Sequence, residues 1–235
     1  LALTQYGEAD LSLLDEKPAS RPPIHTAVLP RQRLNDVMAR LSNAIRDGAQ
    51  AYWICPLVEE TAESDLIAVE ARHRELQTAL GMEIGLVHGR MPSEDKDAVV
   101  ARFAAGEVKI LCATTVVEVG IDVPKASIII IEQAERFGLA QLHQLRGRVG
   151  RGADKSACIL LYDTPLSKSA KARLELLRDT EDGFRIAEMD WRLRGEGDIL
   201  GARQSGFPAY RFVDPVAHAD LIATAAREAV YLLQH

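Results

Sequence analysis

The run Q-L-H-Q-L-R-G-R-V-G-R-G at residues 141–152 sets three arginines among glycines. Between residues 136 and 153 there are four arginines, one histidine and no carboxylate. Arginine is always charged and presents a planar fork of donors that matches phosphate, while Gly147 and Gly150 let the backbone turn and approach a ligand closely. The run therefore predicts an anionic partner. Its spacing favours a nucleotide phosphate over the plainer interpretation, a solvated basic loop.

The same residues carry a family resemblance. Gln144, Gly147, Arg148, Gly150 and Arg151 resemble motif VI of the superfamily 2 helicases. In that family two arginines reach across a cleft as fingers toward ATP, and an inserted arginine stabilises the charge that develops during phosphoryl transfer. The resemblance assigns this catalytic role to Arg148 and Arg151, and it places Gln144 near the attacking water or the γ-phosphate.

A second stretch, A-T-T-V-V-E-V-G-I-D-V-P at residues 113–124, ends a predicted strand in two threonines. Their hydroxyls can reach phosphate oxygens, although threonines after a strand are also frequent helix caps. The stretch resembles helicase motif V. The resemblance implies that Thr114 and Thr115 contact the DNA backbone, and that Gly120 and Asp122 link this contact to the nucleotide.

A third stretch, L-V-H-G-R-M at residues 86–91, sets His88 and Arg90 just after a predicted strand and resembles motif IVa of the same family. The resemblance implies that both contact DNA, while an ordinary surface turn explains the stretch about as well. Neither His88 nor His143 belongs to a cluster of cysteines or carboxylates in the sequence, so we expect no metal ligands.

Two motifs of a complete ATPase are absent from the sequence. There is no G-x-x-x-x-G-K-[S/T] run and no D-E-x-x run at a predicted strand end. Superfamily 2 motors split ATP between two RecA-like domains, and the chain resembles the second, which supplies the arginines. We therefore expect ATP and Mg²⁺ as cofactors, with Mg²⁺ held mainly by the first motor domain. The chain alone should not hydrolyse ATP.

Short apolar runs alternate with amphipathic stretches up to about residue 165, which predicts an α/β fold, a doubly wound and mainly parallel RecA-like sheet. We expect strands at 24–29, 51–55, 84–88, 109–113, 127–131 and 157–162. Periodic apolar residues predict helices at 34–45 and 66–80, and a third helix with Ser93 as its N-cap that ends near Gly106.

The pattern changes after residue 167, where we expect a helical appendage without strands. Helices are predicted around 170–178 and 184–193, then a glycine-rich loop at 195–206 and a last helix opened by Asp214. We therefore divide the chain into a second RecA-like domain at 1–165 and an appendage at 166–235, with a hinge near Thr164. The proline- and charge-rich segment 16–23 is expected to be a linker.

The composition is that of an ordinary globular protein, and it excludes few classes of function. The 235 residues are 47% hydrophobic, and the formal net charge of -6 argues against a surface built mainly to wrap nucleic acid. The three cysteines lie far apart in the sequence without C-x-x-C spacing, which predicts reduced core thiols in a cytoplasmic protein. No run is apolar enough to cross a membrane. The chain begins at Leu1 rather than Met, and we expect it to be a piece of a longer protein.

Three flanking stretches carry a more specific resemblance. They are Y-G-E-A-D-L-S-L-L-D-E-K-P at 6–18, I-C-P-L-V-E-E at 54–60, and L-R-D-T-E-D-G-F-R-I-A-E-M-D-W-R-L-R-G-E-G-D-I-L-G-A-R-Q-S-G at 177–206. All three are similar to the RecG branch-migrating DNA helicases. The last resembles the TRG motif, which the family shares with the transcription-repair coupling factor. There it couples ATP turnover to movement along double-stranded DNA.

Carried over residue by residue, the TRG resemblance assigns translocation coupling to Arg173, Arg194 and Gln204. The sequence departs from the family pattern at Trp191, where an aliphatic residue is usual, and at Glu196, where proline is common. Neither departure removes a charged or amide group. A glycine-rich surface loop with incidental polar residues is the alternative interpretation of this stretch.

The resemblance as a whole implies the second motor domain of a bacterial, cytoplasmic, ATP-dependent DNA helicase. Such an enzyme remodels stalled replication forks and Holliday junctions in DNA repair and recombination. The implied partners are branched double-stranded DNA, the wedge domain and first RecA-like domain of the same protein, and single-stranded-DNA-binding protein as a further candidate. Two alternatives remain, a transcription-repair coupling translocase, which Asp198 and the 54–60 stretch disfavour, and a non-catalytic nucleic-acid-binding scaffold module.

Overall fold

The structure is a computed structural model, and it describes residues 22–56, 62–114, 123, 125–150, 152 and 155–198, with isolated positions between 221 and 232. For residues 62–66 and 191–198 it describes the backbone alone. The start of the last predicted helix at Asp214 and most of the predicted linker lie outside the described residues, and the isolated positions described between 221 and 232 are helical. The contacts divide the chain into two units, of which residues 19–200 form the larger, and this unit contains every element discussed below.

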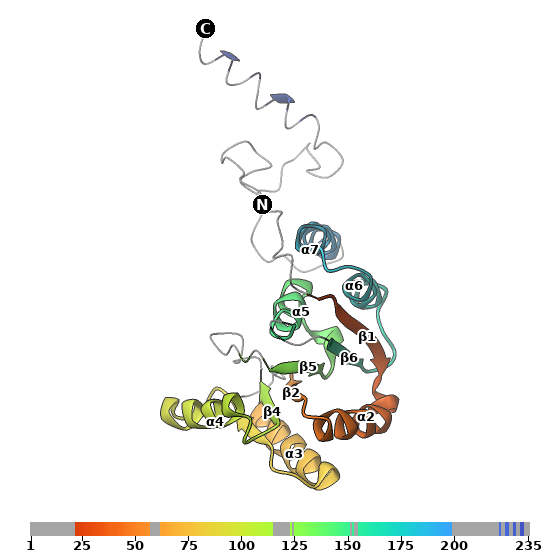
Figure 1. The fold of residues 1–235 in the computed structure, drawn as a ribbon. Helices are drawn as coiled ribbons and strands as arrows, with labels where there is room; N and C mark the ends of the chain where they lie inside the picture. Colours follow the sequence, from red (N-terminus) through yellow and green to blue (C-terminus); the bar gives the residue numbers. More distant parts are fainter. Residues whose placement is uncertain are drawn as a thin grey trace. The chain divides into compact units, whose positions relative to one another are not determined.

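A single six-stranded sheet forms the centre of this unit, with the strand order β1-β6-β5-β2-β4-β3 and parallel pairing throughout (Figure 1). The predicted strands are thereby confirmed, within one or two residues at their ends. Their bounds are β1 Ile24–Pro30, β2 Gln50–Cys55, β3 Gly85–Val87, β4 Ile110–Thr114, β5 Ala126–Ile131 and β6 Ser156–Tyr162.

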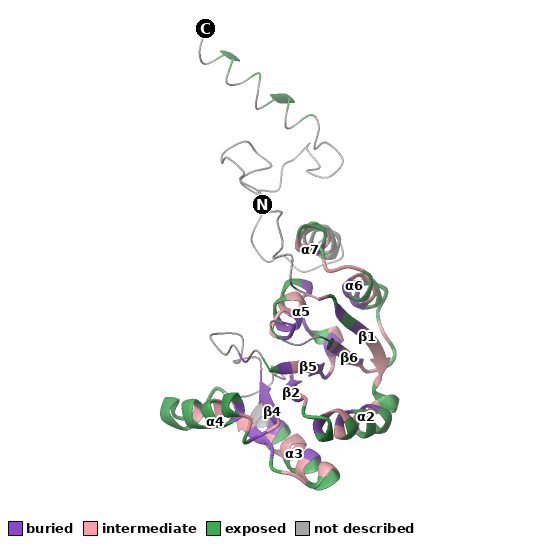
Figure 2. Ribbon diagram, in the orientation of Figure 1, coloured by how far each residue is buried: buried purple, intermediate pink, exposed green. Residues whose placement is uncertain are grey.

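The sheet is buried on both faces, which explains why the strands read as nearly continuous apolar runs. In β2 the side chains of Tyr52 and Ile54 belong to one hydrophobic cluster, and those of Ala51 and Trp53 to another. Because successive side chains of a strand point to opposite faces, the two clusters are the two cores of a three-layer sandwich. Figure 2 shows the central strands β2 and β4 buried and the outer faces of the helices exposed.

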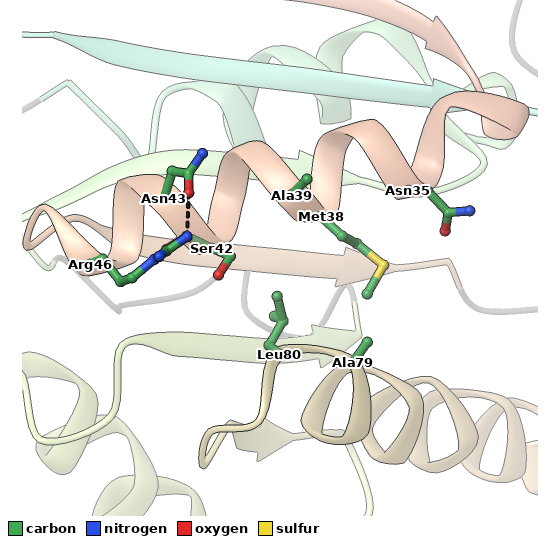
Figure 3. A pocket seen from close by; sticks show the side chains of 8 residues that line it. All are labelled: Asn35, Met38, Ala39, Ser42, Asn43, Arg46, Ala79 and Leu80. Atoms are coloured by element: carbon green, nitrogen blue, oxygen red, sulfur yellow. Dashed lines mark hydrogen bonds between the residues drawn. The ribbon is translucent and has the colours of Figure 1, made fainter.

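Two helices cover the first face of the sheet, α2 at Leu34–Arg46 and α3 at Ala62–Leu80. The buried positions of α2, Val37, Leu41 and Ile45, recur at four-residue spacing and pack with Leu76 of α3. Between α2 and the end of α3 lies a shallow groove of about 420 Å³ (Figure 3). Its lining residues are Asn35, Met38, Ala39, Ser42, Asn43, Arg46, Ala79 and Leu80. None of these is a predicted site residue.

Helix α4 at Ser93–Ala105 contributes Phe103 to the core on the other face, where its ring contacts Tyr52 with centroids 5.1 Å apart. The helix ends at Gly106, whose left-handed φ of 80° makes it a typical glycine stop. The prediction that Ser93 is the N-cap is wrong. Pro92 occupies the cap position, no side chain caps the helix, and Ser93 is the first helical residue.

Three more helices complete this face, α5 at Leu139–Arg146, α6 at Lys168–Asp179 and α7 at Gly183–Asp198. Helix α5 was not predicted. Helix α6 begins two residues earlier than predicted because the Ser167 hydroxyl accepts a hydrogen bond from the backbone N–H of Ala170, 3.1 Å away. The loop predicted from residue 195 is wrong in its first part, since α7 continues through Gly195 and Gly197.

The two appendage helices share a core with the sheet. Leu174 and Leu177 of α6 and Ile186 of α7 are buried in the same cluster as Leu142 and Leu145 of α5. The structure therefore confirms the α/β class and the parallel sheet with helices after it. The functional division at residue 165 stays a prediction.

Candidate nucleotide and DNA interface

Helix α5 presents the predicted nucleotide contacts at its end. Leu142 and Leu145 are buried, whereas Gln144 is exposed and Arg148 is half-buried. A turn continues the helix at its end. The backbone N–H of Gly147 donates to His143 O at 3.0 Å, and the backbone N–H of Arg148 donates to Leu145 O at 3.0 Å. Gln144 lies on the exposed side of α5, and Arg148 lies in the turn that follows the helix.

The loop that follows α5, residues 147–152 and called here the arginine loop, turns at Gly150, where φ is +82°. A Cβ at this position would lie 3.1 Å from Ile24 Cγ1 and 3.7 Å from Ser156 Oγ. Only glycine fits here without strain. Ile24 and Ser156 begin β1 and β6, so the arginine loop rests on the amino ends of these strands. Arg151 lies outside the described residues.

Arg146, the first arginine of the run, has a structural role. Its side chain is 2% exposed. One terminal nitrogen donates to the carbonyl oxygens of Leu177 at 2.6 Å and Thr180 at 2.8 Å, and the other donates to His143 Nδ1 at 2.9 Å. The carbonyls at the end of α6 therefore bind this arginine inside the fold.

Sequence reasoning missed this role although a signal was present. Residues 142, 145, 146 and 149 follow the i, i+3, i+4, i+7 spacing of one helix face, and Leu142, Leu145 and Val149 are buried along with Arg146. An arginine on a buried face must find partners inside the fold, since a buried unpaired charge is costly. The apolar spacing thus distinguishes Arg146 from Arg148.

The predicted DNA contacts lie at the opposite edge of the sheet. β3 pairs with β4 in parallel so that Val87 lies beside Ala113. The next residues, His88 and Thr114, are therefore neighbours at the carboxyl ends of these strands, and Arg90 follows as an exposed side chain. Thr115, Gly120 and Asp122 lie outside the described residues. The chain leaves the carboxyl edge at Thr114 and re-enters the sheet at the amino end of β5.

Two polar atoms at this edge are buried without a hydrogen-bond partner among the described residues, Thr114 Oγ1 and His88 Nδ1. An unsatisfied buried polar atom costs free energy, and a ligand or a rearranged neighbour would remove that cost. Burial also lowers the pKa of His88; the positive charges of Lys96 and Arg90 lower it further, while Glu70 opposes them. The imidazole is thus uncharged at neutral pH.

Arg173 of α6 is held against the segment that leads into α5. Its terminal nitrogens donate to Phe137 O at 3.3 Å and to Glu135 O at 3.0 Å. The predicted coupling residues are thus placed in part. Arg194 lies within α7, where only the backbone is described, and Gln204 lies outside the described residues.

A buried ionic network at the end of β5 was also missed by sequence reasoning. Glu132 accepts hydrogen bonds from Trp53 Nε1 and from both Nε and a terminal nitrogen of Arg72, the latter at 2.9 Å. Its carboxylate ties α3 and β2 to the strand end. The next residue, Gln133, has a left-handed φ of 47° and donates to Asp163 at 2.9 Å. A single acid after four isoleucines was the available signal.

The cysteines are all buried and free. Burial raises the pKa of Cys158 to about 12, against the opposing charge of Arg146. Cys55 and Cys112 are neighbours in space, with Sγ atoms 4.0 Å apart. The hydrogen bond between them raises the pKa of Cys55 most, and burial raises it further. The Cys55 and Cys158 thiols therefore stay protonated.

Over the described residues, no three His, Cys, Asp or Glu side chains gather in a way that could hold a metal ion. The helices in the described part of the chain are each too short or too polar to span a bilayer. What the site offers is therefore an exposed amide and a half-buried arginine beside a glycine turn at one edge of the sheet, and polar groups at the other.

These features define a class. The chain belongs to the helicase conserved C-terminal domain family, whose model matches residues 33–153. The fold is also shared by a solved structure of S. cerevisiae Dbp5 bound to RNA and ADP BeF3, at 17% identity and a TM-score of 0.53 over 83% of this chain and 52% of that one.

Within this class the chain is similar to one kind of helicase along nearly its whole length. It is 50% identical to the ATP-dependent DNA helicase RecG of Escherichia coli K12 over 234 residues, and 43% identical to that of Bacillus subtilis over 235 residues. Each match covers 99% of this chain and 34% of the relative, so the chain spans about a third of the length of these proteins.

A second family model, ATP-dependent DNA helicase RecG, domain 3, C-terminal, matches residues 180–235. A solved structure of RecG bound to a three-way DNA junction matches with a TM-score of 0.72 and 38% identity, over 94% of this chain and 28% of that one. The resemblance inferred from the motifs is thereby confirmed.

Proposed function

We propose that the chain is the second motor domain, with its translocation-coupling segment, of an ATP-dependent double-stranded-DNA translocase. The enzyme would remodel stalled replication forks and Holliday junctions in DNA repair and recombination, in the bacterial cytoplasm. The observation that carries this proposal is 50% identity over 99% of the chain to a RecG helicase, together with the fold of a RecG bound to a three-way junction.

In this proposal the arginine loop completes an ATP site whose phosphate cradle and Mg²⁺ ligands belong to the first motor domain. The residues present fit half of such a site. Gln144 is exposed on α5, and Arg148 is half-buried in the turn that follows this helix. Arg148 and Arg151 would neutralise charge on the transferring phosphoryl group, and Gln144 would hydrogen-bond the attacking water or a γ-phosphate oxygen. ATP, bound together with Mg²⁺, would supply the phosphoanhydride bond that is broken in hydrolysis.

The DNA-contacting group would act at the carboxyl edge. His88, Arg90, Thr114 and Thr115 are proposed to contact the phosphate backbone, because phosphate contacts fix the register of a protein on DNA without reading sequence. Gly120 and Asp122 are proposed to link this group to the nucleotide. In support, the chain passes between Thr114 and β5 from the carboxyl edge to the amino edge, on which the arginine loop rests.

Arg173, Arg194 and Gln204 are proposed to couple domain closure to movement on DNA. Arg173 is bonded to the carbonyls of residues 135 and 137, just before α5, so it is joined to the element that carries Gln144. A hydrogen bond from the Arg173 guanidinium to the Gln204 side-chain amide is also part of the proposal. The first motor domain, a wedge domain and single-stranded-DNA-binding protein are the proposed protein partners.

The match of residues 180–235 to the RecG domain favours this function over a transcription-repair coupling translocase. Intact Gln144 and Arg148 favour a motor over a scaffold.

The test is a junction-unwinding assay with the full-length protein. On a synthetic Holliday junction the protein with ATP should release two-armed products, and it should release none with a non-hydrolysable ATP analogue. A linear duplex of the same length should not be separated. Binding without any ATP-dependent unwinding would instead support the scaffold interpretation.

A further inference from the structure

The turn between α6 and α7 receives contacts from two distant parts of the chain. At its first end, Arg146 donates to the carbonyls of Leu177 and Thr180. At its second end, the Glu181 carboxylate accepts a hydrogen bond from the backbone N–H of Ile24, the first residue of β1, at 2.5 Å. The two partners are 31 and 157 positions away in the sequence, so the turn joins α5 to the beginning of the sheet.

The turn is itself held in shape. The Thr180 hydroxyl accepts from the backbone N–H of Asp182 at 3.1 Å, and the Asp182 carboxylate caps α7 by accepting from the N–H groups of Phe184 and Arg185. Gly183 lies against α5, because a Cβ there would be 3.3 Å from His143 Nε2. A capped turn between two packed helices has little freedom to absorb movement, so it transmits displacement between its contacts.

Ile24 is held from two sides. Its backbone N–H is bound by Glu181, and its side chain packs against Gly150 of the arginine loop, where a Cβ would approach Ile24 Cγ1 to 3.1 Å. The beginning of β1 therefore contacts both the arginine loop and the α6–α7 turn, and the turn also contacts α5, the helix that leads into the loop. Displacement of the beginning of β1 must shift either the arginine loop or the turn.

We propose that Glu181 is a positioning residue for ATP hydrolysis, which fixes the beginning of β1 against the arginine loop so that Arg148 and Arg151 are aligned for the transition state. It acts through Ile24 and touches neither nucleotide nor DNA. This inference rests on the proposed function. Because arginine fingers act mainly in the transition state, a misaligned loop should lower kcat far more than it changes KM for ATP.

The experiment measures DNA-stimulated ATPase kinetics of the full-length protein for the wild type, Glu181→Ala and Glu181→Gln. Glu181→Ala removes the acceptor and should lower kcat about 10-fold, with KM for ATP within about 2-fold, since misplacement of catalytic groups by about 1 Å is costly. Glu181→Gln keeps an oxygen that can accept the Ile24 N–H and should retain more than half of the wild-type kcat. Glu175→Ala, on the exposed side of α6, is the matched control and should leave kcat unchanged.

Each outcome of this experiment either supports or overturns the positioning role of Glu181. If kcat of Glu181→Ala equals the wild-type value, or if Glu181→Gln is as impaired as Glu181→Ala, the positioning role is overturned. If Glu181→Ala loses activity only in proportion to a loss of folded protein, measured by circular dichroism on the same sample, the residue is structural and the proposal also fails. A wild-type protein without DNA-stimulated ATPase would overturn the proposed function instead.

Discussion

At the residue scale, arginines of one short run have different roles. Arg146 is buried, and its guanidinium donates hydrogen bonds to two carbonyls at the end of α6 and to His143. Arg148, two positions later, is half-buried at the turn. Residue type and spacing alone predicted a shared anionic partner. The difference follows from position, because Arg146 falls on the apolar face of α5 and Arg148 falls past its end.

Arg146→Ala should destabilise the fold. The substitution leaves the carbonyls of Leu177 and Thr180 buried without their charged donor, and such losses cost roughly 2 to 4 kcal/mol. Urea unfolding of the chain followed by circular dichroism measures the change. Arg178→Ala is the control, because that side chain is exposed and pairs with the adjacent Asp179, and it should leave the unfolding midpoint nearly unchanged. Equal midpoints for wild type and Arg146→Ala would contradict the role given to Arg146.

At the scale of elements, the strands could be predicted well and the helix ends less well. Parallel strands buried on both faces give apolar runs that few other structures imitate, such as S-I-I-I-I at 127–131. Helix α5 was missed because its sequence, G-L-A-Q-L-H-Q-L-R, contains only a few apolar residues. The stretch was interpreted as part of a phosphate-binding motif and not as a helix. The continuation of α7 through Gly195 and Gly197 was missed because glycine commonly indicates the end of a helix, although one glycine disfavours a helix by only about 1 kcal/mol.

The candidate site could be predicted by type but not by arrangement. Motif resemblance named Gln144, Arg148, His88 and Thr114, yet nothing local in the sequence placed the two groups at opposite edges of the sheet. That separation follows from the strand order and register, which depend on long-range pairing. The Glu132 network and the Glu181 contact likewise join residues 79 and 157 positions apart.

Two serines near helix starts provide a matched test of capping. Ser167 caps α6 with its hydroxyl, while Ser93 begins α4 without a side-chain cap bond. Ser167→Ala should therefore lower the free energy of unfolding by about 1 kcal/mol, whereas Ser93→Ala should change it by only a few tenths of a kcal/mol. Thermal and urea unfolding of both variants gives the comparison. A larger loss for Ser93→Ala than for Ser167→Ala would show that the cap assignments are reversed.

At the scale of the whole molecule, the chain has its own two-sided core but supplies only half of the proposed ATP site. We therefore expect the isolated chain to fold and to show no ATPase and only weak nucleotide affinity, because most of the phosphate charge stays uncompensated. Calorimetry with ATP and Mg²⁺, with a phosphate-release assay on the same sample, checks both expectations. Micromolar ATP binding with turnover that Arg148→Ala abolishes would reveal a complete phosphate site within the chain.

The most direct test of the account is the DNA-stimulated ATPase of the full-length protein carrying Arg151→Ala or Arg148→Ala, measured beside junction binding on the same preparations. Loss of an arginine finger typically lowers turnover by on the order of 10³ to 10⁵, or roughly 4 to 7 kcal/mol of transition-state stabilisation. The account predicts a loss of this size for Arg151→Ala and a large loss for Arg148→Ala, with junction affinity within a few-fold of the wild type. Hydrolysis at a tenth of the wild-type rate or better by both variants would contradict it.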